Sequence, residues 1–250
     1  MSGHSKWSTI KRKKGAEDAK RGKVFTRITR EIMVAAREGG GDETANAKLK
    51  LAIAKARANN MPKDNIERAI ARGTGDGEDT HLDELTYEGY GPDGVAYMVD
   101  VLTDNKNRTL AEVKHAFSRS GGSLASAGSV AWQFEQKGYI VLAGDNLDYE
   151  EVFMVAAEVG ADDVIQEDES IVVYTPREMF GAVEVALDDA GYAVSESELR
   201  WEPKNETELP VDKALKNMRL LEILEELDDV NSVSSNLSMT DELLASLETA

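Results

Sequence analysis

The chain has 250 residues, 41% of them hydrophobic, and a formal net charge of −18 at pH 7. This length allows one or two domains, and a third if the domains are small. The absence of cysteine excludes disulfides, thiolate metal sites and thiol nucleophiles. We find neither a run of about 18 apolar residues nor an apolar segment behind the basic N-terminus. We therefore expect a cytoplasmic protein that does not enter a membrane.

The charge is divided unevenly along the chain. Residues 1–72 contain 18 lysines and arginines against 8 aspartates and glutamates, whereas residues 73–250 contain 11 against 39. A basic block on an acidic protein is the electrostatic footprint of a surface that meets a polyanion, most often nucleic acid. The pattern predicts that the N-terminal block contacts nucleic acid.

The basic block begins with a polar segment and continues with helical periodicity. Residues 1–15 show no apolar periodicity, and we expect a mobile arm. From residue 17 to 38, apolar side chains recur on one arc and most basic ones lie on the opposite arc. A second helix is expected after the N-cap residue Asn46 and runs to about Asn59. A third opens at Met61-Pro62 and ends at Gly73. Three short amphipathic helices predict a small bundle.

A glycine-rich acidic linker at residues 73–79 marks the first domain boundary. Beyond it we expect a strand at 95–102, a helix at 109–120 and a strand at 129–135. The next elements follow the βαββαβ order of ferredoxin-like domains. They are a strand at 139–143, a helix at 149–159, strands at 163–166 and 171–175, a helix at 177–190 and a strand at 192–201. A helix at 212–227 and a strand at 230–237 end the series.

The elements at 95–135 and 212–237 each lack partners of their own, and joining them gives a second α+β domain. The predicted fold class is therefore multi-domain, α and α+β. An N-terminal three-helix bundle is followed by two α/β (ferredoxin-like) domains, the third inserted in the second. The predicted domains are residues 1–73, residues 80–136 plus 204–250, and residues 137–203.

The predicted nucleic-acid contacts lie in the arm and on the polar arc of the first helix. Lysine and arginine side chains neutralise phosphates and release counterions, and an aromatic side chain among them can stack on an unpaired base. In the alternative interpretation the charged face is only solvated and the tryptophan packs on the bundle. The predicted contact residues are Lys6, Trp7, Lys11, Arg12, Lys13, Lys14, Lys20, Arg21, Lys23, Arg27 and Arg30.

A second candidate contact loop lies between a predicted strand and a predicted helix. Its members are Asn105, Lys106, Asn107 and Arg108. Backbone amides at a helix N-terminus and an arginine would suit a phosphate or another polar partner. In the alternative interpretation an asparagine caps the helix and Asp104-Asn105 forms a turn.

The remaining motifs give no sign of catalysis. The G-x-G-x-x-G pattern at residues 89–94 precedes a strand instead of a helix, so we interpret it as a turn. The three histidines lack ligand spacing. The acidic runs at 167–169 and 222–229 are expected to keep the protein soluble or to meet a basic protein partner. We therefore predict no catalytic residue, metal, cofactor or small-molecule substrate, and a non-enzymatic protein.

Several long motifs, in order along the chain, resemble those of the YebC family. They are GHSKW at 3–7, DAKRGKVF at 18–25, GGGD at 39–42, NNMP at 59–62, YEGYGP at 87–92, TDNKNRT at 103–109 and GSV at 128–130. The family is usually described as probable transcriptional regulators and includes the mitochondrial translational activator of cytochrome c oxidase. The resemblance implies a helical domain and two α/β domains, the third inserted in the second. Arg12, Glu43 and Ala47 depart from its usual residues.

Together these observations predict a regulator of gene expression that binds nucleic acid through its N-terminal domain. In one version the target is promoter DNA, as the family description implies. In the other it is ribosomal RNA, and translation is the regulated step. A basic arm with an aromatic suits irregular RNA, and acidic domains suit basic ribosomal neighbours. The residues leave both versions open.

Overall fold

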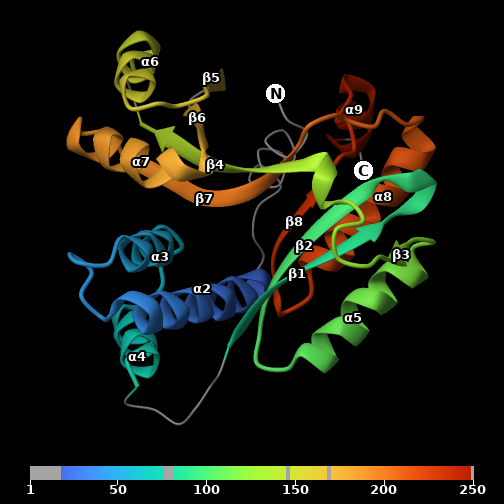
Figure 1. The fold of residues 1–250 in the computed structure, drawn as a ribbon, viewed down its shortest axis with the longest axis horizontal. Coiled ribbons are helices and arrows are strands. Elements are labelled where there is room, and N and C mark those ends of the chain that lie inside the picture. The colour runs from blue at the N-terminus through green and yellow to red at the C-terminus, as the bar shows by residue number, and fades with distance from the viewer. Residues whose placement is uncertain (1–17, 76–81, 145–146, 168–169, 249–250) are drawn as a thin grey trace.

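The computed structural model describes residues 18–75, 82–144, 147–167 and 170–248 (Figure 1). The predicted arm and most of the predicted linker lie outside these residues. Within them the fold is mixed: an N-terminal group of helices is followed by two four-stranded antiparallel sheets with helices of their own.

The first group of helices matches the predicted bundle. It consists of α2 (Asp18–Gly39), α3 (Ala47–Ala58) and α4 (Lys63–Gly73). Ile32 and Leu49 are fully withdrawn from solvent in its core. Asn46 is the N-cap of α3, as predicted, because its side chain accepts the N–H of Leu49. Its amide also donates to the carbonyl oxygens of Ala35 and Gly40 and so ties α3 to the end of α2.

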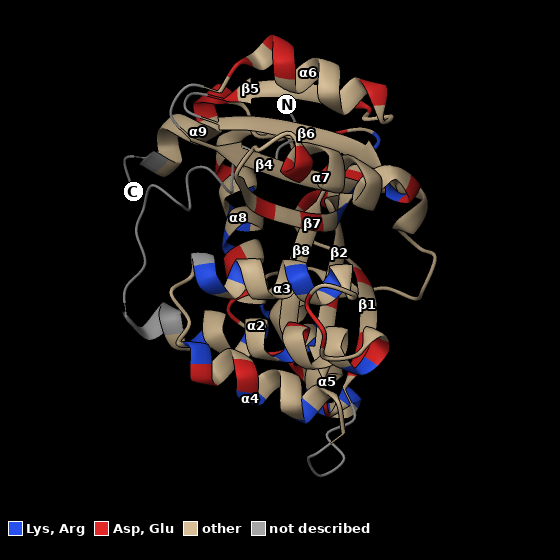
Figure 2. Cartoon of the chain, turned by 90° about the vertical axis from the view of Figure 1, so that its left-hand side faces the viewer, with Lys and Arg blue, Asp and Glu red and all other residues tan. Residues whose placement is uncertain are grey.

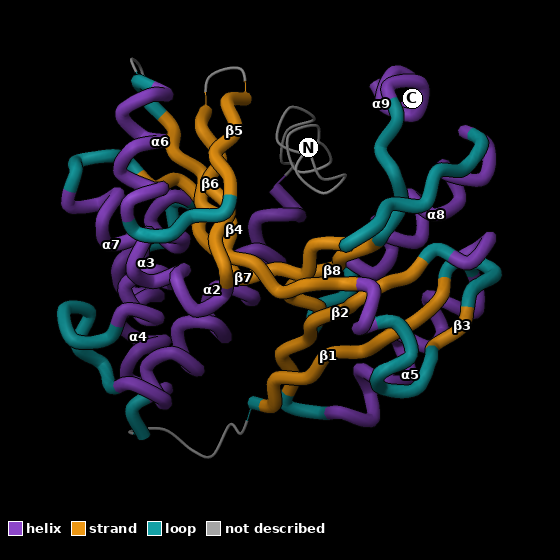
Figure 3. The backbone as a smooth tube through the Cα atoms, turned by 45° about the horizontal axis from the view of Figure 1, so that its top comes forward, coloured by secondary structure: helices purple, strands orange, loops and turns teal. Residues whose placement is uncertain are grey.

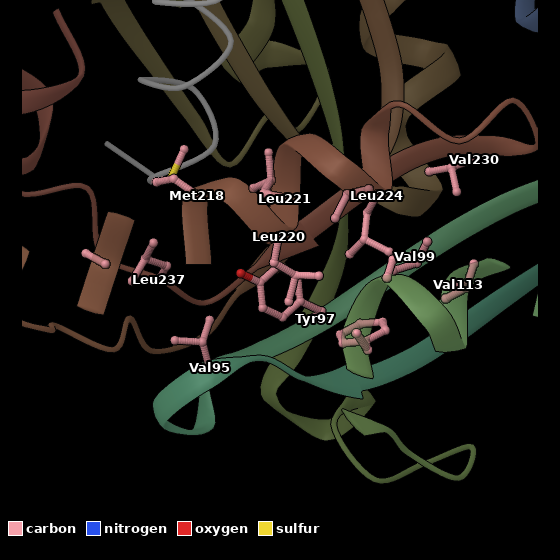
Figure 4. Packing of buried hydrophobic residues seen from close by; sticks show 14 of the residues in the cluster. Val95, Tyr97, Val99, Val113, Met218, Leu220, Leu221, Leu224, Val230 and Leu237 are labelled. Atoms are coloured by element: carbon pink, nitrogen blue, oxygen red, sulfur yellow. The ribbon is translucent and has the colours of Figure 1, made fainter. Parts of the chain in front are cut away.

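Sheet A contains β1 (Asp83–Tyr90), β2 (Ala96–Thr103), β3 (Ser123–Leu124) and β8 (Val230–Ser235) in the order β3-β1-β2-β8. Helices α5 (Lys106–Arg119) and α8 (Val211–Glu225) pack on one of its faces, and α9 (Asp241–Glu248) joins the same core. Figure 4 shows Tyr97 of β2 beneath Leu220 of α8 in this core. The hydroxyl of Tyr97 donates to Asn217 of α8, so its polar end is satisfied.

Sheet B contains β4 (Phe134–Ala143), β5 (Asp163–Glu167), β6 (Ser170–Pro176) and β7 (Val194–Pro203) in the order β5-β6-β4-β7. Helices α6 (Tyr149–Glu158) and α7 (Phe180–Asp189) complete the predicted βαββαβ order. Both pack on the face that carries Ile140 and Val173. Strand β8 follows sheet B in the sequence but belongs to sheet A. This is the arrangement expected from joining the elements at 95–135 with those at 212–237. The division into three domains at the predicted boundaries stays a prediction.

The structure differs from the sequence predictions at four elements. The strand expected at 129–135 is wrong: Ala131–Gln133 is a 3-10 turn, and β4 begins only at Phe134. The carboxylate of Glu88 accepts the N–H groups of Gly128, Val130 and Ala131, so these amides hold a loop and not a strand. Strands β1 and β3 and helix α9 were not predicted. The turn interpretation of residues 89–94 is confirmed, because a 3-10 turn, Pro92–Gly94, separates β1 from β2.

Among the described residues, no helix combines the length and apolar character needed to cross a bilayer.

The contact between α2 and α4 depends on a glycine. A Cβ built on Gly73 would lie 2.5 Å from the carbonyl oxygen of Met33 and 2.8 Å from the Cβ of Ala36. We expect Gly73→Ala to lower the free energy of unfolding by about 1–3 kcal/mol, because the two helices must move apart. Gly22→Ala, which meets nothing within 4 Å, should raise it by up to about 1 kcal/mol. Urea unfolding monitored by circular dichroism measures both, and a shift of the same sign in both variants would contradict this account.

Candidate nucleic-acid interface

The described part of the basic helix α2 is bound to the C-terminal end of α8. The last carbonyl groups of a helix have no intrahelical donor and carry the negative end of its dipole. Arg27 donates to the carbonyl oxygens of Glu225 and Leu227, and the ammonium group of Lys23 donates to that of Glu226 at 2.8 Å. The positive side chains of α2 therefore satisfy carbonyl groups that α8 leaves open, and they hold the bundle beside sheet A.

Asp229, directly before β8, is the buried centre of this junction and is 2% exposed. Its Oδ2 accepts the hydroxyl groups of Thr103 at 3.0 Å and Thr109 at 2.6 Å, and Nη2 of Arg108 at 2.6 Å. Its Oδ1 lies 2.8 Å from Nη1 of Arg30. One carboxylate therefore joins α2, the start of α5 and the start of β8.

The surroundings of Asp229 favour its charged form. Burial alone raises the pKa of the Asp229 carboxyl, but the hydrogen bonds from Thr109, Arg108 and Thr103 and the charge of Arg30 lower that pKa more strongly. The pKa of Arg108 is raised, first by its hydrogen bond to Asp229 and then by the one to Asp104. The junction is therefore an ionised carboxylate between two arginines at neutral pH.

The second candidate contact loop mostly makes contacts within the chain. Asn105 is the N-cap of α5, and its side chain accepts the N–H of Arg108 at 3.1 Å. Lys106 lies 2.9 Å from Asp83, and Arg108 binds Asp104 as well as Asp229. Asn107 is exposed. The capping alternative is thus observed, and contact with nucleic acid at this loop stays a prediction.

Most other lysines and arginines of the bundle have acidic neighbours. Figure 2 shows blue and red residues on α2 and α4, whereas α3 carries only blue ones and finds its acidic partners on other elements. The pairs, all at 2.7–3.4 Å, are Lys48–Glu38, Lys50–Asp188, Lys55–Glu31, Arg57–Glu43 and Lys63–Glu67. Residues 22–72 contain eleven lysines and arginines against six acidic residues, but most of these cations have partners within the chain. Residues 1–21 contain seven lysines and arginines against two acidic residues and are richer in positive charge for their length.

The structure thus divides the predicted contact residues into three groups. Lys6, Trp7, Lys11, Arg12, Lys13 and Lys14 lie outside the described residues. Lys20 and Arg21 belong to α2, but their side chains lie outside the described part. Lys23, Arg27 and Arg30 contact the connection between α8 and β8. The helical pattern separated these three from the bundle core but could not show that a second element covers them.

Sequence reasoning missed Asp229 as the centre of the junction. The acidic run at 222–229 was predicted to solubilise the protein or to meet a basic partner, and it does meet basic side chains, those of α2. Because Asp229 follows a predicted helix, its position at the carbonyl end of that helix was the available signal. In the described part of the chain, no group of three or more histidine, aspartate or glutamate residues could hold a metal ion.

Comparisons with known proteins agree with the YebC-like motifs of the sequence. Residues 5–76 match the family profile described as "TACO1/YebC protein N-terminal domain", and residues 82–237 match the one described as "TACO1/YebC second and third domain". The chain belongs to the TACO1/YebC family.

Two curated relatives and one solved structure illustrate the similarity. A "probable transcriptional regulatory protein" of Acidithiobacillus ferrooxidans is 52% identical over 99% of both chains. Another from Idiomarina loihiensis is 49% identical over 99% of this chain and 100% of the relative. The crystal structure of a conserved hypothetical protein from Aquifex aeolicus is 42% identical, with a TM-score of 0.83 over 91% of this chain and 94% of that one.

The junction generates a pH-dependent prediction. We expect Asp229→Asn to lower the free energy of unfolding at pH 7 by about 1.5–3 kcal/mol, because charge-assisted hydrogen bonds are lost and two arginines each lose a charged partner. The folded-state pKa of Asp229 lies below the unfolded value of about 3.9. Its stabilising contribution is therefore present above about pH 4 and is lost as the pH falls through the folded pKa.

Urea unfolding from pH 7 down to pH 3 measures this difference. The gap between the wild type and Asp229→Asn should narrow below about pH 4. Glu222→Gln, which removes a charge from an exposed position of α8, serves as the control and should leave the curve nearly unchanged. A gap that stays constant down to pH 3 would show that folding leaves the pKa of Asp229 unshifted and would contradict this account.

Proposed function

We propose that the protein is a non-enzymatic, cytoplasmic, nucleic-acid-binding regulator of gene expression and, by family, a DNA-binding transcriptional regulator. The relatives named above are regulators by name, which supports the general role. The observation that carries the binding proposal is the distribution of charge. Most lysines and arginines of the described bundle helices have partners within the chain, and residues 1–21 add a dense surplus of lysine and arginine.

In this proposal residues 1–21 contact the phosphate backbone. Contacts from lysine and arginine to phosphates fix position and orientation but do not read sequence. The three-domain arrangement completes the proposal: the N-terminal domain binds, and the two acidic α/β domains are directed away from the polyanion. Those domains would then be available to basic protein partners. The proposal includes no membrane and no small-molecule substrate.

Translation is the second candidate for the regulated step. Trp7 lies within the basic run, and an aromatic among cations suits the unpaired bases of ribosomal RNA better than a regular duplex. The acidic α/β domains also suit the basic proteins that surround such RNA. The same N-terminal residues would make the contact in both cases.

We expect the triple variant Lys11→Glu, Lys13→Glu, Lys14→Glu to bind nucleic acid much more weakly than the wild type. Each lost phosphate contact should reduce the slope of log K against log salt by about 0.9 on duplex DNA, or about 0.7 on a single strand. The three changes together should reduce the slope by roughly two to three units. Fluorescence anisotropy titrations at several salt concentrations measure both the affinity and the slope.

The control carries the same change of net charge away from the N-terminus. Lys114→Glu, Lys216→Glu and Arg219→Glu alter three exposed positions of α5 and α8, and this variant should retain most of the affinity. Equal losses in both variants would mean that only net charge matters and would contradict the assignment to residues 1–21. Competition between duplex DNA and a ribosomal RNA fragment in the same titration separates the two versions.

A further inference from the structure

The two faces of sheet B differ in how they are covered. Figure 3 shows α6 and α7 on the same side of this sheet. Their partners in the sheet are Ile140, Leu142 and Val173, whose side chains share one face. The described residues place no helix on the opposite face, which we call the outer face.

The centre of the outer face is nevertheless withdrawn from solvent. Tyr139 and Val141 of β4 pair with Tyr174 and Val172 of β6, so these four side chains share a face. Tyr139, Val141 and Val172 are 0% exposed, and Tyr174 is 7% exposed. The two tyrosine rings contact each other with their centroids 5.6 Å apart. The guanidinium group of Arg200 lies over the Tyr139 ring, 3.3 Å from its centroid, and covers part of this centre. The valines beside it still require a cover, and no helix of the described residues supplies one.

The charges around this centre indicate what kind of segment fits. Strand pairing places two basic residues, Lys137 and Arg200, on the outer face. Arg200 pairs with Glu202, and Lys137 with Asp162 at 3.1 Å. The acidic residues that the pairing places on the outer face outnumber them and are Glu135, Asp163, Glu167, Glu196, Glu198 and Glu202. A complementary segment is therefore basic and carries apolar side chains of its own.

Residues 1–17 have this composition. They contain five lysines and arginines against a single acidic residue, with Trp7 and Ile10 among them. The other segments outside the described residues do not fit, because 76–81 is acidic and the rest contain two residues each. Seventeen residues can span up to roughly 56–61 Å. They join α2 close to sheet B, since Lys23 contacts Asp228, next to β8, and β8 lies beside β7.

We propose that the outer face of sheet B binds the basic N-terminal segment of the same chain, residues 1–17. The apolar centre receives the apolar side chains of the segment, and the acidic rim pairs with its lysines and arginines. One consequence rests on the proposed function: a nucleic acid and the outer face compete for the same side chains. The acidic face would then lower the affinity for nucleic acid and favour long or strongly charged targets.

A single nitroxide spin label at Ser8→Cys tests the proposal in the full-length chain, which has no other cysteine. Paramagnetic broadening of methyl signals reports which groups lie near the label. We expect the methyl groups of Val141 and Val172 on the outer face to broaden more than those of Val152 and Val183 beneath the helices. The broadening should weaken at about 1 M salt, where the Debye length is about 3 Å.

Two matched double variants locate the contact. Asp163→Lys with Glu167→Lys reverses charge on the outer face and should reduce the broadening, while unchanged inner methyl signals confirm the fold. Glu150→Lys with Glu158→Lys makes the same charge change on α6, on the other side of the sheet. This variant should leave the broadening unchanged. Equal broadening in the two variants would overturn the proposal.

Two further outcomes would also overturn it. Broadening of methyl signals from copies without the nitroxide, when they are mixed with spin-labelled copies that give no methyl signal, would make the occupant a second copy of the chain. A pattern of broadening centred away from sheet B would leave the outer face to a basic protein partner.

Adding a saturating nucleic acid should abolish the broadening. If the broadening persists in the bound complex, the competition with nucleic acid is contradicted, but the contact of residues 1–17 with the outer face is not. The label experiment without nucleic acid is independent of whether the proposed function holds.

Discussion

The carbonyl end of α8 and the buried carboxylate of Asp229 beside it need positive partners, and much of the structure depends on how this need is met. A helix end without donors and an isolated buried charge are both costly. Arg27 and Arg30 of α2 supply the partners from a distant part of the sequence, and Arg108 supplies another from the start of α5. The same contacts join the bundle to sheet A, together with Leu102 of β2, which packs into the core of the bundle.

This constraint changes how the basic N-terminal block is understood. Charge counting treats all 18 of its lysines and arginines as equally available to a polyanion. In the folded chain, part of that charge is used at the junction with α8, and another part is paired with acidic residues of the bundle and of α7. The surplus at residues 1–21 is what the proposed binding uses.

Local patterns predicted most of the elements but not their long-range partners. The three helices of the bundle and the βαββαβ order of sheet B follow from apolar periodicity and capping residues, and each was predicted within a few residues. Strand β1 was missed because its exposed positions carry polar side chains, a pattern that is also typical of a loop. The strand expected at 129–135 failed because Glu88, some 40 residues away, binds its amides. The partners of Arg27 and Arg30 lie about 200 residues away. A helical wheel shows only residues of the same helix, so it could not predict these partners.

A double-mutant cycle between Arg30 and Asp229 tests the central claim most directly. The free energy of unfolding would be measured for the wild type, Arg30→Met, Asp229→Asn and the double variant. We predict a coupling energy of about 1–3 kcal/mol, because the two groups stabilise each other at a largely buried junction between α2 and β8. A coupling energy near zero would mean that the two changes act independently and that this pair does not hold the bundle in place.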